Sequence, residues 1–241
     1  MRLVICLPTY NERANLEPIA RRLGDVLAEL GAEPRVLVID DSSPDGTGEL
    51  ADRLSDELPF VSVLHRTRKL GLGPAYVAGF RWALEHDADR IVQMDCDFSH
   101  DPADVPRLIA ASESAGLALG SRYVEGGGTK NWGRGRQAIS RFGSFYARTI
   151  LGVPVRDLTG GFKCWRREAL EALPLERIRT KGYAFQIETT YRAIRAGFKV
   201  AEIPIVFAER RAGGSKMTQG IVLEAVAAVP ELRIRAALNR L

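Results

Sequence analysis

The chain has 241 residues, 46% of them hydrophobic and 27% charged, and a formal net charge of +4 at pH 7. This composition is ordinary for a soluble globular protein, and the small positive balance permits contact with anionic lipid or phosphorylated ligands without requiring nucleic acid. The three cysteines, Cys6, Cys96 and Cys164, are odd in number and widely spaced. That spacing excludes a zinc motif and an evident set of disulfides, and it indicates a reducing compartment.

Short apolar runs alternate with helix-patterned segments through the first half of the chain. The runs are continuous rather than alternating, as expected for strands of a parallel sheet covered on both faces. They occupy residues 3–8, 35–40, 61–65, 90–95 and 117–123. Apolar residues at helical spacing follow the first run, and residues 45–58 and 71–88 show the same pattern. This β-α-β-α-β order predicts an α/β fold that binds ligands beyond the carboxyl ends of its strands.

The second half of the chain is less regular. Residues 125–136, "EGGGTKNWGRGR", are glycine-rich and basic, so we expect a mobile loop there. Further elements are predicted at residues 137–151 (helix), 185–196 (helix) and 199–207 (strand). The tail Gln219–Leu241 has an amphipathic helical pattern, which we expect Pro230 to break.

No targeting segment is evident. The apolar stretch near the N-terminus is too short for a secretory signal, and no window approaches roughly 18 uncharged apolar residues, the length of a membrane span. Since no internal repeat occurs, we expect one unit, with a domain over residues 1–216 and a helical tail over 217–241. We expect this unit to lie on a membrane rather than to cross one.

Two carboxylates, Asp95 and Asp97, stand at the end of the apolar run in "IVQMDCDFSH". Residues i and i+2 of an extended chain point the same way, so both side chains can converge on one point. Two such anions repel each other and resist burial, a conflict that a divalent cation or a cationic partner would remove. For an isolated pair the alternative is a turn in which aspartates cap backbone N–H groups. The position at a strand end favours a functional site.

Two other strand ends carry candidate binding residues. In "LPTYNE", Tyr10 suits stacking on a ring and Glu12 suits a base edge, although taken alone a strand-to-helix turn explains the segment better. In "IDDSSPDGT", Asp41 suits ribose or base recognition, and a turn is an even alternative. No dinucleotide fingerprint, Walker A sequence or nucleophile-base arrangement is found, which disfavours hydride transfer, P-loop chemistry and covalent hydrolysis.

Cationic residues gather in the second half. Arg122 follows the fifth predicted strand, Arg134 and Arg136 lie in the glycine-rich segment, and "ERRAGGSK" contains Arg210 and Lys216. A solvated face is the simpler interpretation of any single arginine, but its fork of donors suits phosphate. Together with the paired carboxylates and the candidate base pocket, these cations favour a nucleotide-diphosphate donor.

Ten motifs, in order along nearly the whole chain, resemble those of the family 2 GT-A glycosyltransferases, and most closely those of polyprenol (dolichol) phosphate mannose synthases. They are "LPTYNE", "DDSSPDGT", "KLGLG", "DCDFSH", "GSRY", "RQAIS", "DLTGGFK", "KGYAFQIE", "EIPIVF" and "RRAGGSK". The resemblance implies an α/β GT-A fold, a single domain with a mostly parallel central sheet flanked by helices. It also implies transfer of mannose from GDP-mannose to polyprenyl (dolichyl) phosphate, with inversion.

The resemblance further implies roles for single positions. Asp95 and Asp97, on either side of Cys96, would join Mg²⁺ or Mn²⁺ to the donor diphosphate. The nucleoside pocket would be formed at the first two strand ends by Pro8, Tyr10, Glu12, Ile39 and Asp41. The cations at the donor diphosphate or acceptor phosphate would be Arg122, Arg210 and Lys216, with Arg136 and Ser140 helping to hold the acceptor phosphate. The catalytic groups would be Asp95, Asp97, Arg122 and Arg210.

The chain also departs from the family pattern. The middle residue of the D-x-D is usually Ala and is Cys96 here, which a backbone contact would survive, and some members have Gln where Ser99 stands. Certain relatives carry C-terminal membrane spans that are absent from this sequence. The resemblance therefore implies peripheral attachment to the cytoplasmic face of a membrane, through the amphipathic tail, a membrane-anchoring partner subunit or a fused domain. The stripe in that tail, which fits packing on the domain as well as lipid, comprises Ile221, Ala225, Ala228 and Leu232.

Three alternatives stay open at this point. UDP-glucose or a related donor would serve the same acceptor, since nothing here separates guanine from uracil or one C2 epimer of a hexose from the other. A phospholipid-binding scaffold without activity is the second. The intact candidate site residues argue against it, namely Asp95, Asp97, Arg122 and Arg210. A nucleic-acid binder is disfavoured by the modest charge and by the lack of aromatics on a basic face.

Overall fold

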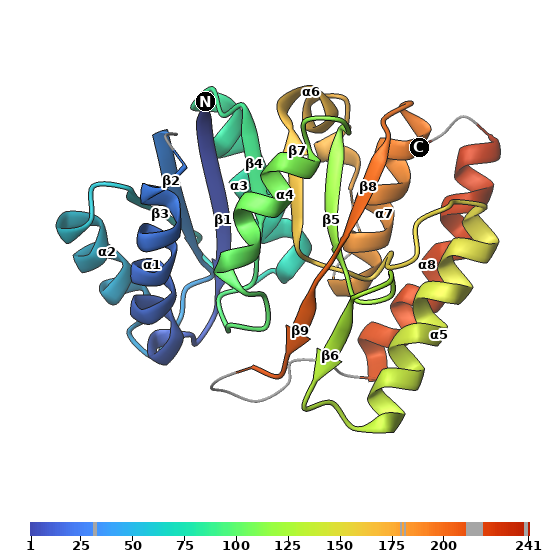
Figure 1. Ribbon diagram of the computed structural model, residues 1–241, viewed down its shortest axis with the longest axis horizontal. Helices are drawn as coiled ribbons and strands as arrows, with labels where there is room; N and C mark the ends of the chain where they lie inside the picture. The colour runs from blue at the N-terminus through green and yellow to red at the C-terminus, as the bar shows by residue number, and fades with distance from the viewer. Residues whose placement is uncertain (31–32, 179, 181, 211–218, 239–240) are drawn as a thin grey trace.

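A mixed β-sheet organises the chain in the computed structural model (Figure 1). Over the described residues it has seven strands in the order β3-β2-β1-β4-β7-β5-β8. These are β1 (Arg2–Thr9), β2 (Glu33–Asp40), β3 (Val61–His65), β4 (Arg90–Gln93), β5 (Leu117–Ser121), β7 (Lys163–Arg166) and β8 (Val200–Pro204). A separate parallel pair consists of β6 (Gly128–Lys130) and β9 (Val206–Ala208). The structure describes residues 1–30, 33–178, 180, 182–210, 219–238 and 241, and of residues 219–223 only the backbone.

The five strands predicted in the first half are all present, within a few residues of the expected bounds. Ile5, Val38 and Ile91 at their centres are fully buried, because helices cover both faces of the sheet. Neighbouring strands are parallel except where β7 takes part. The prediction of an α/β fold with a mostly parallel central sheet is therefore confirmed.

Strand β7 lies between β4 and β5 and runs antiparallel to both. Its first residue, Lys163, pairs with Gln93 of β4 and with Leu119 of β5. No strand was predicted here, because the four residues Lys-Cys-Trp-Arg form neither a long apolar run nor an alternation. β7 joins the part of the sheet built by β1 to β4 to the part built by β5 and β8.

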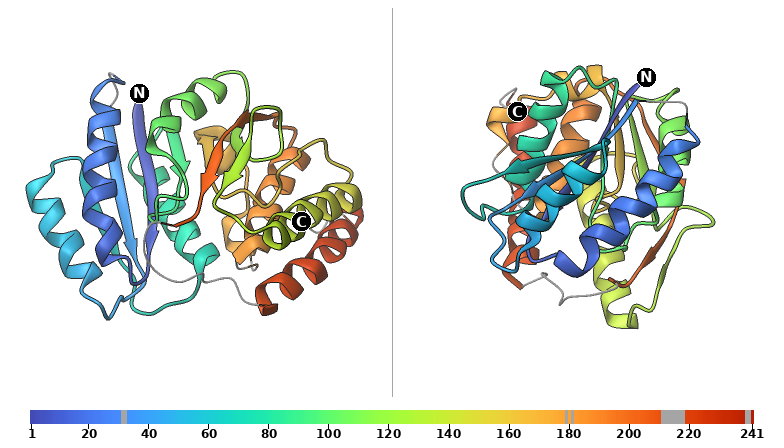
Figure 2. Two further views of the ribbon diagram at one scale, coloured as in Figure 1. Left: turned by 60° about the horizontal axis from the view of Figure 1, so that its bottom comes forward. Right: turned by 90° about the vertical axis from the view of Figure 1, so that its left-hand side faces the viewer.

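Helices cover both faces of the sheet (Figure 2). One face carries α1 (Arg13–Ala28), α2 (Thr47–Glu57) and α4 (Val105–Ala111), and the other carries α3 (Leu72–Glu85), α6 (Arg167–Glu171) and α7 (Gly182–Arg195). Short 3₁₀ turns lie at Pro102–Asp104 and Leu175–Arg177. The strand order runs from β1 outward to β3 on one side and continues with β4 on the other. Such a reversal point is where open α/β sheets bind ligands, beyond the carboxyl ends of the strands.

Two long helices, α5 (Arg134–Leu151) and α8 (Gln219–Ala237), lie side by side at one end of the molecule (Figures 1 and 2). Helix α8 also packs on α7, and it buries Val229, Leu232 and Ala236 in a core cluster shared with both helices. The described part of the tail thus packs on its own domain. Ile221 of the predicted stripe is outside the described side chains.

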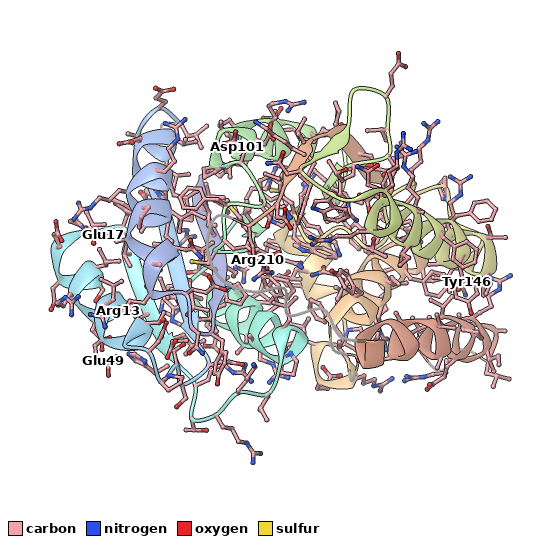
Figure 3. All side chains as sticks on the ribbon, turned by 90° about the horizontal axis from the view of Figure 1, so that it is seen from below. Arg13, Glu17, Glu49, Asp101, Tyr146 and Arg210 are labelled. Carbon is pink, nitrogen blue, oxygen red and sulfur yellow. The ribbon has the colours of Figure 1, made fainter. Side chains whose placement is uncertain are left out.

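Pro230 does not break α8, contrary to the prediction. A proline inside a helix leaves the carbonyl four residues earlier without its usual N–H donor. That carbonyl belongs to Val226, and the hydroxyl of Tyr146 on α5 donates to it at 3.0 Å. Tyr146 lies between the two helices (Figure 3). A donor from another helix therefore replaces the one that proline lacks.

The glycine-rich segment 125–136 is not a loop throughout, which corrects a second prediction. It contains β6, whose backbone pairs with β9, and its last residues already belong to α5. The helix begins at Arg134 rather than at Gln137. The strand predicted over 199–207 is likewise two strands, since the chain leaves β8 after Pro204 and pairs with β6 instead.

Candidate active site

A cavity of about 440 Å³ lies at the carboxyl edge of the sheet, next to the ends of β1 and β4. Figure 3 views the molecule from this edge, and Arg210 lies near the centre of the view. The lining residues come from segments that follow β1, β3, β4 and β5, and from α5, α7 and β9. The cavity brings together most of the residues predicted from the sequence, among them Pro8, Glu12, Asp95, Cys96, Asp97, Arg122, Arg136 and Arg210.

Asp97 serves both as a turn residue and as a charge in the cavity. β4 ends at Gln93, so Asp97 lies in the turn that follows, where its Oδ1 accepts a hydrogen bond from the Ser99 N–H at 3.0 Å. Its Oδ2 is 3.2 Å from Nη2 of Arg210. The turn interpretation and the functional interpretation thus apply to the two oxygens of one carboxylate.

Asp95 is the second carboxylate, and burial raises its pKa above the ordinary value. The charge of Asp97 acts in the same direction, and His100 opposes it. Tyr76 donates to Oδ1 of Asp95 at 3.2 Å, and the backbone N–H of Asp95 donates to Nδ1 of His100 at 3.2 Å. His100 stacks on Phe162 with ring centroids 4.8 Å apart, and burial lowers its pKa. Nδ1 of His100 thus acts as an acceptor that holds the turn after β4.

The carboxylate pair fits a divalent cation that is shared with a substrate. Asp95 and Asp97 both line the cavity, and the raised pKa of Asp95 reflects a conflict that a cation would relieve. Within the described residues, no cluster of three or more His, Cys, Asp or Glu side chains offers a complete metal cage. Mg²⁺ in particular is commonly held by one or two carboxylates together with substrate phosphates. Cys96, between the aspartates, belongs to the core cluster below the cavity and also contributes to the cavity lining.

Arg122 is held by a partner that the sequence analysis missed, Asp157. Its backbone N–H and Nε donate to Oδ2 of Asp157 at 2.9 and 2.7 Å, and its Nη2 donates to Oδ1 at 2.7 Å. Nη2 also donates to the hydroxyl of Thr159 at 2.8 Å. Burial alone would lower the pKa of Arg122, but the charge and hydrogen bonds of Asp157 outweigh it, so the pKa is raised. Among the described residues Nη1 has no hydrogen-bond partner, which leaves it for a phosphate.

Arg136 and Trp132 provide buried donors without partners. Nε of Arg136 and Nε1 of Trp132 are both buried and have no hydrogen-bond partner among the described residues. The guanidinium lies 4.0 Å from the centre of the Trp132 ring, and its Nη1 reaches Glu209 at 3.5 Å. Unpaired buried donors are costly, so their occurrence together indicates a place for an anion.

A small apolar groove between α5 and α8 meets the cavity at these donors. The two share the lining residues Trp132, Arg136, Thr159 and Tyr183. Beyond them the groove is lined mainly by apolar side chains, including Ile139, Tyr146, Ile187, Val226 and Val229. Ser140 lines the groove one helical turn after Arg136, and its hydroxyl accepts a hydrogen bond from Tyr123 at 2.7 Å. Arg136 and Ser140 thus stand where a polar cavity changes into an apolar groove.

The candidates for the nucleoside pocket are only partly brought together. Pro8 and Glu12 line the cavity, as does Lys69, whose Nζ lies 3.7 Å from the centre of the Tyr10 ring. Ile39 is different, because its side chain is fully buried in the core against α3.

Two predicted positions, Asp41 and Lys216, are absent from the described lining of the cavity. Asp41 forms an ion pair with Arg66 and accepts the Leu70 N–H at 3.3 Å, beside the cavity rather than in its lining. Lys216 is outside the described residues.

The buried Lys163 holds a residue that lines the cavity, Gln186. Nζ of Lys163 donates to the backbone oxygen of Gln186 at 2.9 Å and to the Thr189 hydroxyl at 3.3 Å, and burial lowers its pKa to about 7. Gln186 lines the cavity and accepts from Nε2 of Gln93 at 2.6 Å. Lys163 and Asp157 both lie in "DLTGGFK", a motif that the sequence analysis quoted without giving either residue a role.

Comparison with known proteins gives consistent matches. The family model for glycosyl transferase family 2 matches residues 4–173. An undecaprenyl-phosphate mannosyltransferase of Micrococcus luteus is 49% identical over 94% of this chain and 91% of its own length. A polyprenol monophosphomannose synthase of Mycolicibacterium smegmatis is 46% identical over 99% of this chain and 89% of its own.

Solved structures of glucosyl-3-phosphoglycerate synthase from Mycobacterium tuberculosis share the architecture. The complex with Mn²⁺, UDP-glucose and phosphoglyceric acid matches with a TM-score of 0.68 and 19% identity, over 97% of this chain and 79% of that one. The complex with UDP matches with a TM-score of 0.66 and 20% identity, over 97% and 80%. At such identities the likeness concerns the fold alone.

Proposed function

Because the chain belongs to glycosyl transferase family 2 and has the GT-A fold, we propose that it transfers mannose from GDP-mannose to the phosphate of a polyprenyl phosphate, with inversion at the anomeric carbon. The two mannosyltransferase relatives, at 49% and 46% identity over nearly the full length, support both the sugar and the acceptor class. GDP as the nucleotide rests on the motif resemblance.

The observation that carries the proposal is the junction of the polar cavity with the apolar groove. A lipid phosphate needs a charged site for its head and an apolar surface for the start of its chain. Arg136 and Trp132 each supply a donor that has no partner within the described part of the chain, and Ile139, Val226 and Val229 line the groove beyond that junction. The carboxylates that suit a nucleotide sugar line the same polar cavity as these donors.

The acceptor would need positioning more than deprotonation. A phosphate monoester has a second pKa of about 6, so its oxygens are already largely ionised at neutral pH. In the proposed step an acceptor oxygen forms a bond to the anomeric carbon while the bond from that carbon to GDP breaks, and the electron pair leaves with GDP. Arg122, Arg136 and Ser140 would hold the acceptor phosphate for this displacement.

The departing GDP would be stabilised by preorganised charge. Arg210, close to Asp97, places a cation where the donor diphosphate is proposed to bind, and Lys216 is assigned to the same role from the sequence. A bound Mg²⁺ or Mn²⁺ on Asp95 and Asp97 would add Lewis-acid stabilisation of the leaving diphosphate. For the nucleoside, Pro8 and Glu12 at the wall of the cavity are the first candidates, with Tyr10 and Asp41 beside them.

The acceptor places the proposed reaction at a membrane. We assign the enzyme to the cytoplasmic face of that membrane, attached peripherally or through a partner subunit or fused domain. Within the described part of the chain, no helix combines the length and apolar character needed to traverse a bilayer.

The test is a transfer assay with labelled sugar and a short polyprenyl phosphate dispersed in detergent. We expect lipid-linked product from GDP-mannose, and only with Mg²⁺ or Mn²⁺ present. A parallel arm with UDP-glucose tests the donor, since product from UDP-glucose alone would overturn the assignment of GDP-mannose. No product from either donor while GDP still binds would overturn the proposed transferase activity.

The metal assignment has its own variant and control. Asp97→Asn should lower transfer at least about a hundredfold and should weaken Mn²⁺ binding in the presence of GDP, measured by calorimetry. Asp101→Asn is the matched control, because Asp101 lies away from Arg210 (Figure 3) and caps the Ala103 N–H at 2.9 Å, a role that Asn also fills. Equal activity and equal Mn²⁺ binding in the two variants would remove Asp97 from the metal site.

A further inference from the structure

A second cavity, of about 470 Å³, lies on the flank of α5 away from the acceptor groove. It is lined by residues of α5 and of the segments after β5 and before β7, namely Arg122, Tyr123, Val124, Gly127, Arg141, Phe145, Arg148 and Arg156. We call it the basic cleft. Only Arg122 is shared with the polar cavity of the candidate active site.

The basic cleft holds three arginines besides Arg122, and the carboxylate of Glu202 accepts the backbone N–H of one of them, Arg156, at 2.8 Å. Among the described residues, no carboxylate forms a salt bridge with Arg141, Arg148 or Arg156, whereas Arg122 at the back is paired with Asp157. The guanidinium of Arg141 lies 5.8 Å from the centre of the Tyr123 ring, and that of Arg148 lies 5.9 Å from the Phe145 ring. Three cations around one cavity repel one another, so an anion with several oxygens would stabilise the arrangement.

Helix α5 adds an exposed apolar stripe beside these charges. Ile139, Phe142 and Phe145, spaced three residues apart, are 57%, 67% and 57% exposed. The helix contains four arginines and no acidic residue in its 18 positions. Aromatic residues between cations, with no carboxylate on the same helix, are typical of helices that lie in the interface of an anionic membrane.

We propose that the basic cleft binds the phosphate of an anionic phospholipid headgroup, while Phe142 and Phe145 enter the membrane surface next to it. α5 would then rest on the bilayer between two sites, the acceptor groove on the flank of Ser140 and the headgroup site on the flank of Arg141. The proposal draws on the proposed function only in taking the acceptor to be a membrane lipid. A soluble phosphate compound offers the same oxygens but gives the exposed phenylalanines nothing to contact.

The test measures vesicle binding with neither donor nor acceptor present, so it is independent of catalysis. The full chain is sedimented with vesicles of phosphatidylcholine alone, and with vesicles in which part of it is replaced by phosphatidylglycerol. We expect binding to the second kind to fall about fivefold for each of Arg141→Gln, Arg148→Gln and Arg156→Gln, and about a hundredfold for the triple variant. Phe142→Ser should weaken binding with the arginines intact.

Three exposed arginines on other helices provide the matched control, Arg22 of α1, Arg53 of α2 and Arg81 of α3. The triple variant Arg22→Gln/Arg53→Gln/Arg81→Gln removes the same net charge and should keep nearly all of the binding. Both triple variants should transfer sugar to a detergent-dispersed acceptor as the unmodified chain does, which shows that they are folded. Equal vesicle binding by the two triple variants would overturn the proposal.

Discussion

The ion pair of Arg122 and Asp157 gives the sharpest test of how the candidate site is supported. The side chain of Arg122 is 5% exposed and that of Asp157 is 0% exposed, and three N–H groups of Arg122 donate to this one carboxylate. Asp157→Asn preserves the shape but leaves the guanidinium buried without a counter-ion. Removing one partner of a buried pair costs about 3–5 kcal/mol. That is a large part of the roughly 5–15 kcal/mol by which a domain is stable.

Urea denaturation followed by circular dichroism measures the change in the free energy of unfolding. Glu17→Gln is the control, because Glu17 and its partner Arg21 are each 46% exposed and an exposed pair contributes less than about 1 kcal/mol. The double variant Arg122→Met/Asp157→Leu should regain most of the stability, since an apolar pair of similar volume removes the buried charges, but it should not regain transfer activity. A loss in Asp157→Asn no greater than that in Glu17→Gln would refute the reasoning.

Three further predictions concern other parts of the fold. Tyr146→Phe removes the donor to the Val226 carbonyl and should lower the free energy of unfolding by about 1 kcal/mol; an equal loss in a Pro230→Ala background, which restores an N–H donor, would contradict this role. Lys163 has a pKa of about 7 when folded and 10.5 ordinarily, so the unfolded state binds more protons between those values. The unmodified chain should therefore gain stability relative to Lys163→Met as the pH rises from about 7 to about 9 in urea titrations, and a flat difference would oppose it. Gly79→Ala would place a Cβ 2.4 Å from Cδ1 of Ile39 and should lower the free energy of unfolding by about 1–3 kcal/mol, a loss that Ile39→Val should partly reverse. An unchanged thermal unfolding curve would show that Ile39 is not packed there.

The sheet and the place of the site were predictable because local patterns determine both. Continuous apolar runs identify strands that are covered on both sides, and the parallel order places all their carboxyl ends at one edge. Asp95 and Asp97 follow such a run, so their arrival at the cavity with Pro8 and Glu12 required no knowledge of the side-chain packing.

What escaped prediction depends on contacts between distant segments. Asp157 pairs with Arg122 across 35 positions, and the donor that lets α8 continue past Pro230 comes from Tyr146 on another helix. Neither partner has a local signature. Ile39 is a different case, because it lies within the continuous apolar run of a strand covered on both faces, a position that already predicts a place in the core beside Leu37.

Strand β7 has a consequence for the order in which the chain can fold during synthesis. β4 is complete at Gln93, but its second neighbour arrives only with residues 163–166. Until then the edge of β4 exposes unpaired backbone groups beside the apolar Ile91 and Val92, a surface prone to pair with other chains. Pairing over so long a separation is slow, because the loop must close before the contact is gained. During synthesis, Asp95 and Asp97 therefore follow a strand whose edge is still unpaired. That edge is paired only when β7 has been made, near the end of the residues that match the family.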